Sequence, residues 1–111
     1  MAYAQGSVVI GPATFKSGRR PYLVVSNRER PFYGNRYTVA VVTSTERPEA
    51  VPIERGSISD GGLKTYPSFV RPWSLHVLPH QEITKRVAQL DTTTMHRVAD
   101  RIRALTRVHS D

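Results

Sequence analysis

Residues 17–27 read Ser-Gly-Arg-Arg-Pro-Tyr-Leu-Val-Val-Ser-Asn, and this stretch decides the kind of fold that the chain can form. From Pro21 to Asn27 it is rich in β-branched and aromatic residues, which predicts a buried β-strand. Gly18 permits a tight turn before the strand, and Pro21 excludes α-helical geometry for Arg20. We therefore expect Arg20 to be held extended where the strand begins.

Further short strands, separated by turn-forming residues, are predicted on both sides of this one. They cover residues 7–10, 37–44, 50–54, 68–78 and 84–90. The continuous apolar run within 37–44 predicts a strand that is covered on both faces. The polar segments 11–20 and 27–35 are predicted to be loops. Several short strands at this spacing favour a small barrel or a strongly curled sheet.

The hydrophobic period changes after Asp91, whose carboxylate is a suitable N-cap for a helix. Apolar residues then recur at the three- and four-residue spacing of an amphipathic helix. They are Met95, Val98, Ala99, Ile102, Leu105 and Val108. We predict a single α+β domain, mainly β, over residues 1–111, in which this C-terminal helix packs its apolar stripe on the sheet.

The charge balance indicates an anionic partner. The 111 residues carry 16 Lys+Arg against 9 Asp+Glu, a formal net charge of +7, and only three of the basic residues are lysines. Arginine binds phosphate with a planar, two-pronged group and stacks on bases. Nucleic acid is favoured over a membrane, because no segment combines a large apolar face with a lysine-rich one. Arginine-rich codon usage with a solvated charged surface accounts equally well for any single arginine.

Several classes of protein are excluded or disfavoured. The chain has no cysteine, so neither a disulfide framework nor a cysteine zinc site is possible. The apolar runs are too short to span a membrane, and the N-terminus lacks the pattern of a secretory signal, so we expect a cytoplasmic protein. No phosphate-binding loop or paired carboxylates occur, and Pro79 interrupts the spacing of His76 and His80. We therefore expect no metal and no cofactor.

Two polar elements at strand ends are candidates for chemistry. Arg20 stands where a guanidinium suits the charge that develops on a pentavalent phosphate, although it stays protonated and cannot act as a conventional general base. Thr43, Ser44 and Thr45 provide three hydroxyl groups at the end of an apolar strand. A surface arginine beside a turn, and hydroxyls that satisfy loop backbone groups, are the alternative interpretations.

In combination these motifs resemble the MazF/PemK family of toxin-antitoxin ribonucleases. The segments that carry the resemblance are Gly6-x-Val-Val, Gly18-Arg-Arg-Pro-Tyr-Leu-Val-Val-Ser-Asn27 and Val39-Ala-Val-Val-Thr-Ser44. The likeness continues through Gly61-Gly-Leu63, Ser68-Phe-Val70 and the closing helix. The Pro-Phe-Tyr-Gly and Ser-Phe-Val-Arg-Pro-Trp segments are closer to an archaeal branch of the family.

The resemblance implies an SH3-like, strongly curved β-barrel with a C-terminal helix that forms a homodimer. It also implies metal-independent cleavage of single-stranded RNA and neutralisation by a protein antitoxin, which we expect to be acidic. In this reaction the 2′-hydroxyl attacks the adjacent phosphate and leaves a 2′,3′-cyclic phosphate and a 5′-hydroxyl. By motif, Arg20 matches the catalytic arginine and Thr43 the catalytic threonine. Arg20 would stabilise the pentavalent phosphate, and Thr43 would position the scissile phosphate or the 2′-hydroxyl.

RNA-binding roles are expected for basic and polar residues near this pair. They are Lys16, Arg19, Arg28, Arg30 and Ser44, with Lys64 and Arg71 as secondary candidates. The basic residues at 16, 19, 28 and 30 lie on the two loops that we expect to flank the site. Loop aromatics would provide stacking platforms for unpaired bases. These are Phe15, Phe32, Tyr33 and Tyr66, whereas Phe69 and Trp73 are expected in the core or a dimer interface.

Two departures from the family pattern and two rival interpretations remain. The common Gly-Asp-Val near the start of the family pattern is Gly6-Ser7-Val8 here. Many members carry Gly-Ser-Glu in the first loop, but this chain has Gly11-Pro-Ala-Thr-Phe-Lys16, without the acid. The difference bears on RNA sequence preference and proton transfer, and it leaves Arg20 and Thr43 untouched. The rivals are a catalytically silent nucleic-acid-binding barrel, which predicts salt-dependent binding without cleavage, and a protein-interaction domain, which leaves the arginines unexplained.

Overall fold

The computed structural model describes residues 1–14 and 16–110. In chain order its strands are β1 (Ser7–Pro12), β2 (Arg19–Val24), β3 (Arg36–Thr43), β4 (Val51–Ile53), β5 (Ile58–Gly61), β6 (Ser68–Pro79) and β7 (Lys85–Leu90). Two short 3₁₀ turns, η1 (Arg55–Ser57) and η2 (His80–Glu82), and the helix α1 (Thr92–Thr106) complete the fold. No helix in the described part of the chain is long and apolar enough to cross a membrane.

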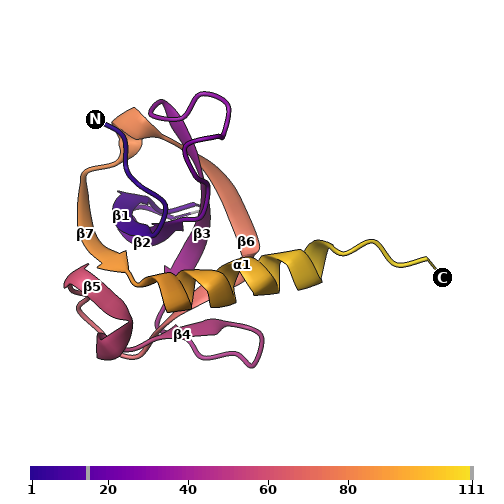
Figure 1. Cartoon of the computed structure of the whole chain (residues 1–111). Coiled ribbons are helices and arrows are strands. Elements are labelled where there is room, and N and C mark those ends of the chain that lie inside the picture. Colours follow the sequence, from indigo (N-terminus) through magenta and orange to yellow (C-terminus); the bar gives the residue numbers. More distant parts are fainter. Residues whose placement is uncertain (15, 111) are drawn as a thin grey trace.

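The seven strands form one antiparallel sheet in the order β4-β6-β3-β2-β1-β7-β5. The sheet curls into a nearly closed barrel, and α1 crosses the lower part of it from near β5 to beyond β6 (Figure 1). The predicted mainly β fold, a small curled barrel with a C-terminal helix, is therefore confirmed.

Alternation along the strands divides the core into two clusters. One includes Leu23, Val42 and Val70 and continues to Val98 of α1, so it lies between the sheet and the helix. The other includes Val41 and residues that alternate with the first set, and Tyr3 and Tyr33 pack against it. Because β2 and β3 contribute to both clusters, the prediction that the 37–44 strand is covered on both faces is confirmed.

The long strand β6 bends at an irregularity that its proline explains. Its pairing with β3 shifts from Leu75, opposite Ala40, to Arg71, opposite Val41, so residues 72–74 are left out of the register. Pro72 has no backbone N–H to donate and commonly occurs at such bulges. The bend lets one strand pair with β3 along its whole length and with β4 at one end.

Several strands and the helix begin or end at other residues than predicted. Strand β2 begins at Arg19, before the proline, so Arg20 lies within the strand. Four residues of the predicted 11–20 loop are strand as well, because β1 continues to Pro12 and β2 begins at Arg19. Strand β5 was missed, since its sequence Ile-Ser-Asp-Gly has little strand character and it forms only by pairing with β7. The helix ends at Thr106, so Val108 lies beyond it and is exposed.

Candidate functional site

Arg20 is held by contacts on both sides of its guanidinium group. Its Nη2 donates a hydrogen bond to the carbonyl oxygen of Val42, 3.1 Å away, on the neighbouring strand β3. The guanidinium carbon lies 5.9 Å from the centre of the Tyr22 ring, a cation–π distance. Tyr22 is fixed in turn, because its hydroxyl donates to the carbonyl oxygen of Pro12 at 2.6 Å. The extended geometry predicted for Arg20 is confirmed, and the group is directed at the end of β3.

Thr43 is the last residue of β3 and lies beside Arg20. Tyr22 pairs with Val41, so two further steps along this antiparallel register bring Arg20 opposite Thr43 on the same face of the sheet. The Thr43 Oγ1 accepts a hydrogen bond from the backbone N–H of Thr45 at 3.2 Å. This contact uses a lone pair of the oxygen, so the hydroxyl proton is free to be donated to a ligand.

Three other predicted residues lie at this end of the β2–β3 pair, with different surroundings. Ser44 is exposed directly after Thr43, and Lys16 is exposed in the 13–18 connection between β1 and β2. Arg19 alternates with Arg20 along β2, so its side chain leaves the opposite face of the strand. Its Nη2 donates to the carbonyl oxygen of Glu82 at 2.5 Å, which holds it against η2. Phe15, predicted to stack on bases, lies outside the described residues.

Arg28 and Arg30 are not brought to the same place. They belong to the 27–35 loop, which joins the end of β2 to the start of β3 at the top of Figure 1. The Nε of Arg30 donates to Thr38 Oγ1 at 2.9 Å, and its Nη1 donates to the carbonyl oxygen of Pro31 at 2.6 Å. Thr38 is five residues from Thr43 on β3, or about 17 Å at about 3.4 Å per residue. The expectation that both loops flank one site is therefore wrong, because they cap opposite ends of the same strand pair.

Arg71 on β6 stands out by an unpaired nitrogen. Among the described residues, two buried side-chain polar atoms lack a hydrogen-bond partner, and they are the Nε atoms of Arg20 and Arg71. The guanidinium carbon of Arg71 lies 5.3 Å from the centre of the Trp73 ring. Sequence reasoning ranked Arg71 among secondary candidates, because its position relative to Thr43 depends on the pairing of β6 with β3.

The histidines do not form a metal site. His76 packs edge-on against the Tyr22 ring at 6.3 Å between ring centres, and His80 Nδ1 lies 2.7 Å from the hydroxyl oxygen of Tyr37. Within residues 1–14 and 16–110 no group of three His, Cys, Asp or Glu side chains converges as metal ligands would. The four-residue spacing of the two histidines therefore reflects two separate aromatic contacts.

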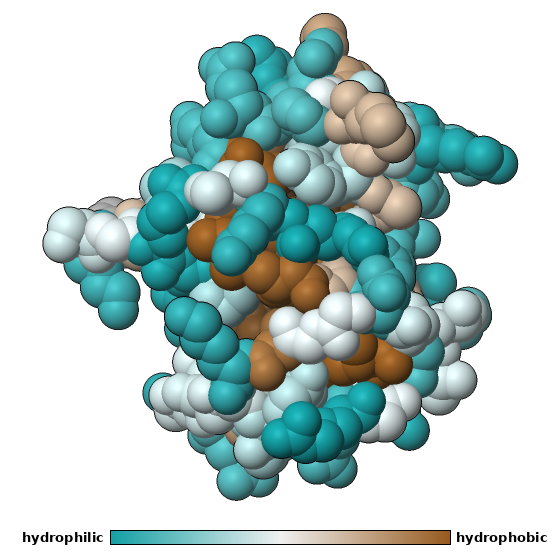
Figure 2. Space-filling model, turned by 90° about the vertical axis from the view of Figure 1, so that its left-hand side faces the viewer, coloured by the Kyte–Doolittle hydropathy of each residue, from teal (hydrophilic) through white to brown (hydrophobic). Residues whose placement is uncertain are grey.

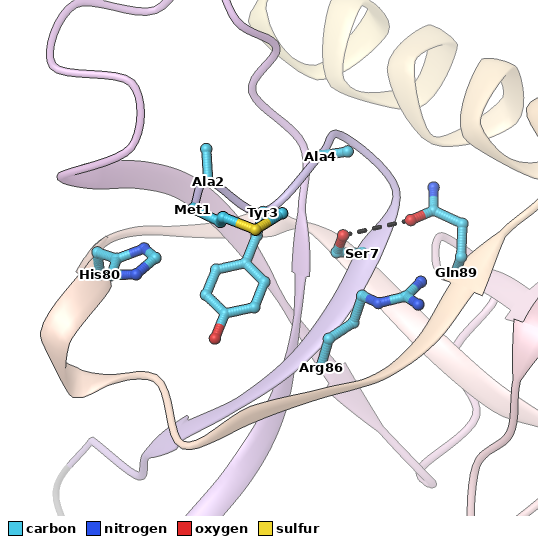
Figure 3. A pocket seen from close by; sticks show the side chains of 8 residues that line it. All are labelled: Met1, Ala2, Tyr3, Ala4, Ser7, His80, Arg86 and Gln89. Atoms are coloured by element: carbon cyan, nitrogen blue, oxygen red, sulfur yellow. Dashed lines mark hydrogen bonds between the residues drawn. The ribbon is translucent and has the colours of Figure 1, made fainter.

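One hollow of the surface lies away from Arg20 and Thr43. It has a volume of about 500 Å³, and Figure 3 shows Tyr3 and His80 on one side of it, with Arg86 and Gln89 of β7 on the other. Ser7 donates a hydrogen bond to Gln89 across its floor, at 3.2 Å. The view towards β5 and β7 shows hydrophobic atoms across the middle of this face, with hydrophilic side chains around and between them (Figure 2). The hollow is thus a shallow gap beside the N-terminal segment.

Arg20 and Arg71 form no ion pair with a carboxylate of the described residues. The two ion pairs of the described residues are Arg86 with Asp60 at 2.7 Å and Arg103 with Asp100 at 2.5 Å. Neither includes Arg20 or Arg71. A fixed guanidinium beside a threonine hydroxyl that can still donate, in a chain with excess positive charge, is suited to an anionic phosphodiester.

Comparison with known families identifies the family of the chain. A family model described as the PemK-like, MazF-like toxin of type II toxin-antitoxin systems matches residues 5–106. The chain belongs to this family, and the resemblance inferred from its motifs is confirmed. A search of curated proteins finds no significant match.

Solved structures with the same fold cover almost the entire chain. One is an endoribonuclease in complex with its cognate antitoxin from a mycobacterial species, with a TM-score of 0.75, 18% identity, and coverage of 99% of this chain and 98% of that one. The Mycobacterium tuberculosis toxin MazF-mt6 has a TM-score of 0.73 and 21% identity, over 94% of this chain and 99% of that one. A MazE–MazF structure from Deinococcus radiodurans has a TM-score of 0.75 and 19% identity, over 98% and 99% of the two chains. At these identities the likeness establishes the fold.

Proposed function

We propose that this chain is the toxin of a type II toxin-antitoxin pair and that it is an endoribonuclease acting on single-stranded RNA in the cytoplasm. The observation that carries the proposal is the guanidinium of Arg20, bonded to the Val42 carbonyl and placed beside the free hydroxyl proton of Thr43. Family membership supports the toxin role, and two of the solved structures with this fold are described as endoribonucleases.

The proposed reaction is a transesterification within the RNA. The ribose 2′ oxygen bonds to the adjacent phosphorus while the bond from phosphorus to the 5′ oxygen breaks. The 2′-hydroxyl proton passes to solvent and the 5′ oxygen gains a proton, so the products are a 2′,3′-cyclic phosphate and a 5′-hydroxyl. Arg20 stabilises the charge of the pentavalent phosphate, and the Thr43 hydroxyl donates a hydrogen bond to a phosphate oxygen. These steps need no metal ion.

The other predicted residues serve binding in this proposal. Lys16 and Ser44 lie at the Arg20 end and contact phosphates next to the scissile one. Arg19 contributes positive charge there although it is bonded to Glu82. Arg28 and Arg30 contact RNA that extends along β3 to the other end of the strand pair.

The test is a cleavage assay on long single-stranded RNA in EDTA, with end-group analysis of the fragments. Wild type should produce cyclic phosphate ends, and Arg20→Ala should reduce kcat by about 100-fold or more, as the loss of a donor to a developing oxyanion does. Thr43→Val removes the hydroxyl but keeps the branched shape, whereas Thr43→Ser should retain much of the activity. Arg103→Ala removes an arginine from the exposed face of α1 and is the matched control.

The outcomes separate the proposal from its rival. If folded wild type binds RNA with strong salt dependence but leaves many different sequences intact, the barrel is a silent nucleic-acid-binding module. Activity that survives in Arg20→Ala as well as in Arg103→Ala would remove Arg20 from the mechanism.

We further propose that the toxin is a homodimer and that an acidic protein antitoxin neutralises it. Leu75 and Val77 are exposed apolar side chains on the same face of β6, beyond its bulge. Such a row of exposed apolar side chains along one strand suits the self-complementary interface of a two-fold dimer, so we assign it to a second copy. The antitoxin would bind the arginines on the exposed face of α1 and at the site itself.

A further inference from the structure

The register of β3 and β6 places Arg71 next to Thr43. Thr43 pairs with Phe69 and Val41 pairs with Arg71, so Arg71 is the diagonal neighbour of Thr43 on the same face of the sheet. Diagonal neighbours across an antiparallel pair have Cβ atoms about 7–8 Å apart. Since the sheet order is β6-β3-β2, Arg71 flanks Thr43 on one side and Arg20 flanks it on the other.

Arg71 forms no ion pair with any described residue. Its Nε is buried without a hydrogen-bond partner, and neither of the two ion pairs includes it. Its guanidinium group lies over the Trp73 ring instead. Leaving a buried donor of a charged group unpaired is costly, and Arg20 shows the same feature on the other side of Thr43. Thr43 thus has an arginine with a buried, unpaired Nε on the strand to each side of it. This arrangement points to an anion that binds between or beside the two arginines.

The surroundings of Arg71 suit an extended phosphodiester chain. The residues Arg47, Glu49, Arg71, Trp73 and Leu105 line a hollow of about 370 Å³. The hollow carries a net positive charge, because it has two arginines and Glu49 is its one acidic residue. Glu49 forms no ion pair with either arginine. Arg47 belongs to the 44–50 loop that continues from Thr43, so the hollow adjoins the candidate site. The bulge at residues 72–74 begins directly after Arg71, and bulges commonly redirect side chains beside active sites.

We propose that Arg71 binds an RNA backbone phosphate adjacent to the scissile phosphate held by Arg20 and Thr43. Its role is substrate binding in the ground state, with the Trp73 ring holding the guanidinium in position. The inference rests on the proposed function in naming RNA as the polymer. It can be tested without cleavage, because binding of an uncleavable RNA reports the phosphate contact directly.

The first test measures binding of a randomised 12-nucleotide single-stranded RNA with fluorine in place of every 2′-hydroxyl, by fluorescence anisotropy over a range of salt concentrations. Arg71→Gln should weaken binding about tenfold, the effect of losing a hydrogen bond to a charged group. The slope of log K against log salt should fall by about 0.7, the value for one phosphate contact on a single strand. Arg103→Gln removes the same charge from α1 and should leave the slope unchanged. Arg71→Lys should restore the slope.

The second test separates a flanking contact from a general structural effect. A dinucleotide has only the scissile phosphate, so Arg71→Gln should cleave it at the wild-type rate while its KM for a 12-nucleotide RNA rises about tenfold with kcat unchanged. The inference would be overturned if Arg71→Gln lost equal activity on both substrates, or if its slope of log K against log salt equalled that of wild type. A reduced dimer fraction with unchanged RNA affinity would assign Arg71 to the subunit interface instead. If wild type cleaves no RNA but Arg71→Gln still lowers the slope, the proposed catalysis fails and the phosphate contact stands.

Discussion

At the scale of single residues, Tyr37 joins separate segments of the chain through one buried hydroxyl. The oxygen accepts a hydrogen bond from the backbone N–H of Tyr3 at 3.0 Å and lies 2.7 Å from Nδ1 of His80. With a neutral imidazole, the hydroxyl proton is donated to that nitrogen. The ring is fully buried, and this burial is the main cause of a pKa raised above that of an ordinary tyrosine. The N-terminal segment and η2 are thus held to the start of β3.

Tyr37→Phe should therefore destabilise the protein by about 1–3 kcal/mol, because a buried N–H and a ring nitrogen lose their partner. Urea unfolding at pH 7 measures this. The matched control is Tyr33→Phe, since the Tyr33 hydroxyl makes a longer bond, 3.4 Å, to the carbonyl oxygen of Tyr3. If Tyr33→Phe lowers the free energy of unfolding as much as Tyr37→Phe does, the role given to the buried hydroxyl is contradicted.

The raised pKa of Tyr37 also predicts how stability depends on alkaline pH. The neutral phenol is favoured in the folded state, so its contribution is complete below the ordinary tyrosine pKa of about 10. It is lost as pH rises from there through the folded-state pKa, because the unfolded chain ionises first. The free energy of unfolding should fall more steeply above about pH 10 in wild type than in Tyr37→Phe. Parallel curves for the two proteins would exclude this linkage.

At the scale of elements, α1 begins as its sequence predicts. The Asp91 carboxylate accepts a hydrogen bond from the backbone N–H of Thr94 at 2.8 Å, which satisfies one of the free donors of the first turn. Hydrogen bonds from the Thr94 side chain and backbone lower the pKa of Asp91 below its usual value. Val98 on the buried face then packs in the core between the helix and the sheet. The cap therefore helps to set where the helix starts on the barrel.

Asp91→Ala should lower the free energy of unfolding by about 1 kcal/mol at pH 7, as the loss of an N-cap does. Asp91→Asn keeps an acceptor oxygen and should cost less. Because the folded-state pKa is lowered, the charged cap contributes fully above the ordinary pKa of about 4, and its contribution is lost as pH falls below that. The free energies of unfolding of wild type and Asp91→Asn should thus come closer together as the pH is lowered from 7 to 3. A difference that stays constant over this range would contradict the linkage.

At the scale of the whole molecule, the β2–β3 pair separates the basic residues into two groups. Arg20, Lys16 and Thr43 lie at one end of the pair, and the 27–35 loop with Arg28 lies at the other. A single nucleotide cannot reach both ends, which are about 17 Å apart at the spacing of strand residues. An RNA must therefore be several nucleotides long to contact both groups.

Arg28→Gln should weaken binding of an uncleavable 12-nucleotide RNA and leave binding of a trinucleotide unchanged, whereas Lys16→Gln should weaken both. Anisotropy titrations at fixed salt measure the four affinities. Equal effects of Arg28→Gln on the two lengths would show that RNA approaches the loop by another path.

The exposed apolar row on β6 makes a prediction about assembly. Sedimentation velocity of wild type should show a dimer, and Val77→Glu should shift it towards monomer, because a charge would be buried in the interface. Val77 is 58% exposed in the single chain, so the substitution should leave the fold intact. The control is Val108→Glu, at an exposed position beyond α1. A monomeric wild type would remove the dimer proposal.

The sequence by itself determined the strand-rich barrel, the capped C-terminal helix and the extended placement of Arg20. The physical reason is that these features depend on local properties, namely β-branched runs, a proline after the arginine, helical periodicity and a capping aspartate. The family followed from the same motifs, because they occur in order along the chain.

The tertiary structure alone decided which of these residues share a site. Thr43 is far from Arg20 in the sequence, yet the antiparallel pairing of β2 with β3 brings the two side by side. Strand β5 formed through pairing with β7 rather than through its own composition, and Arg71 came beside Thr43 only through the register of β6 with β3. Register and strand order depend on contacts between residues distant along the chain, which local sequence patterns do not encode.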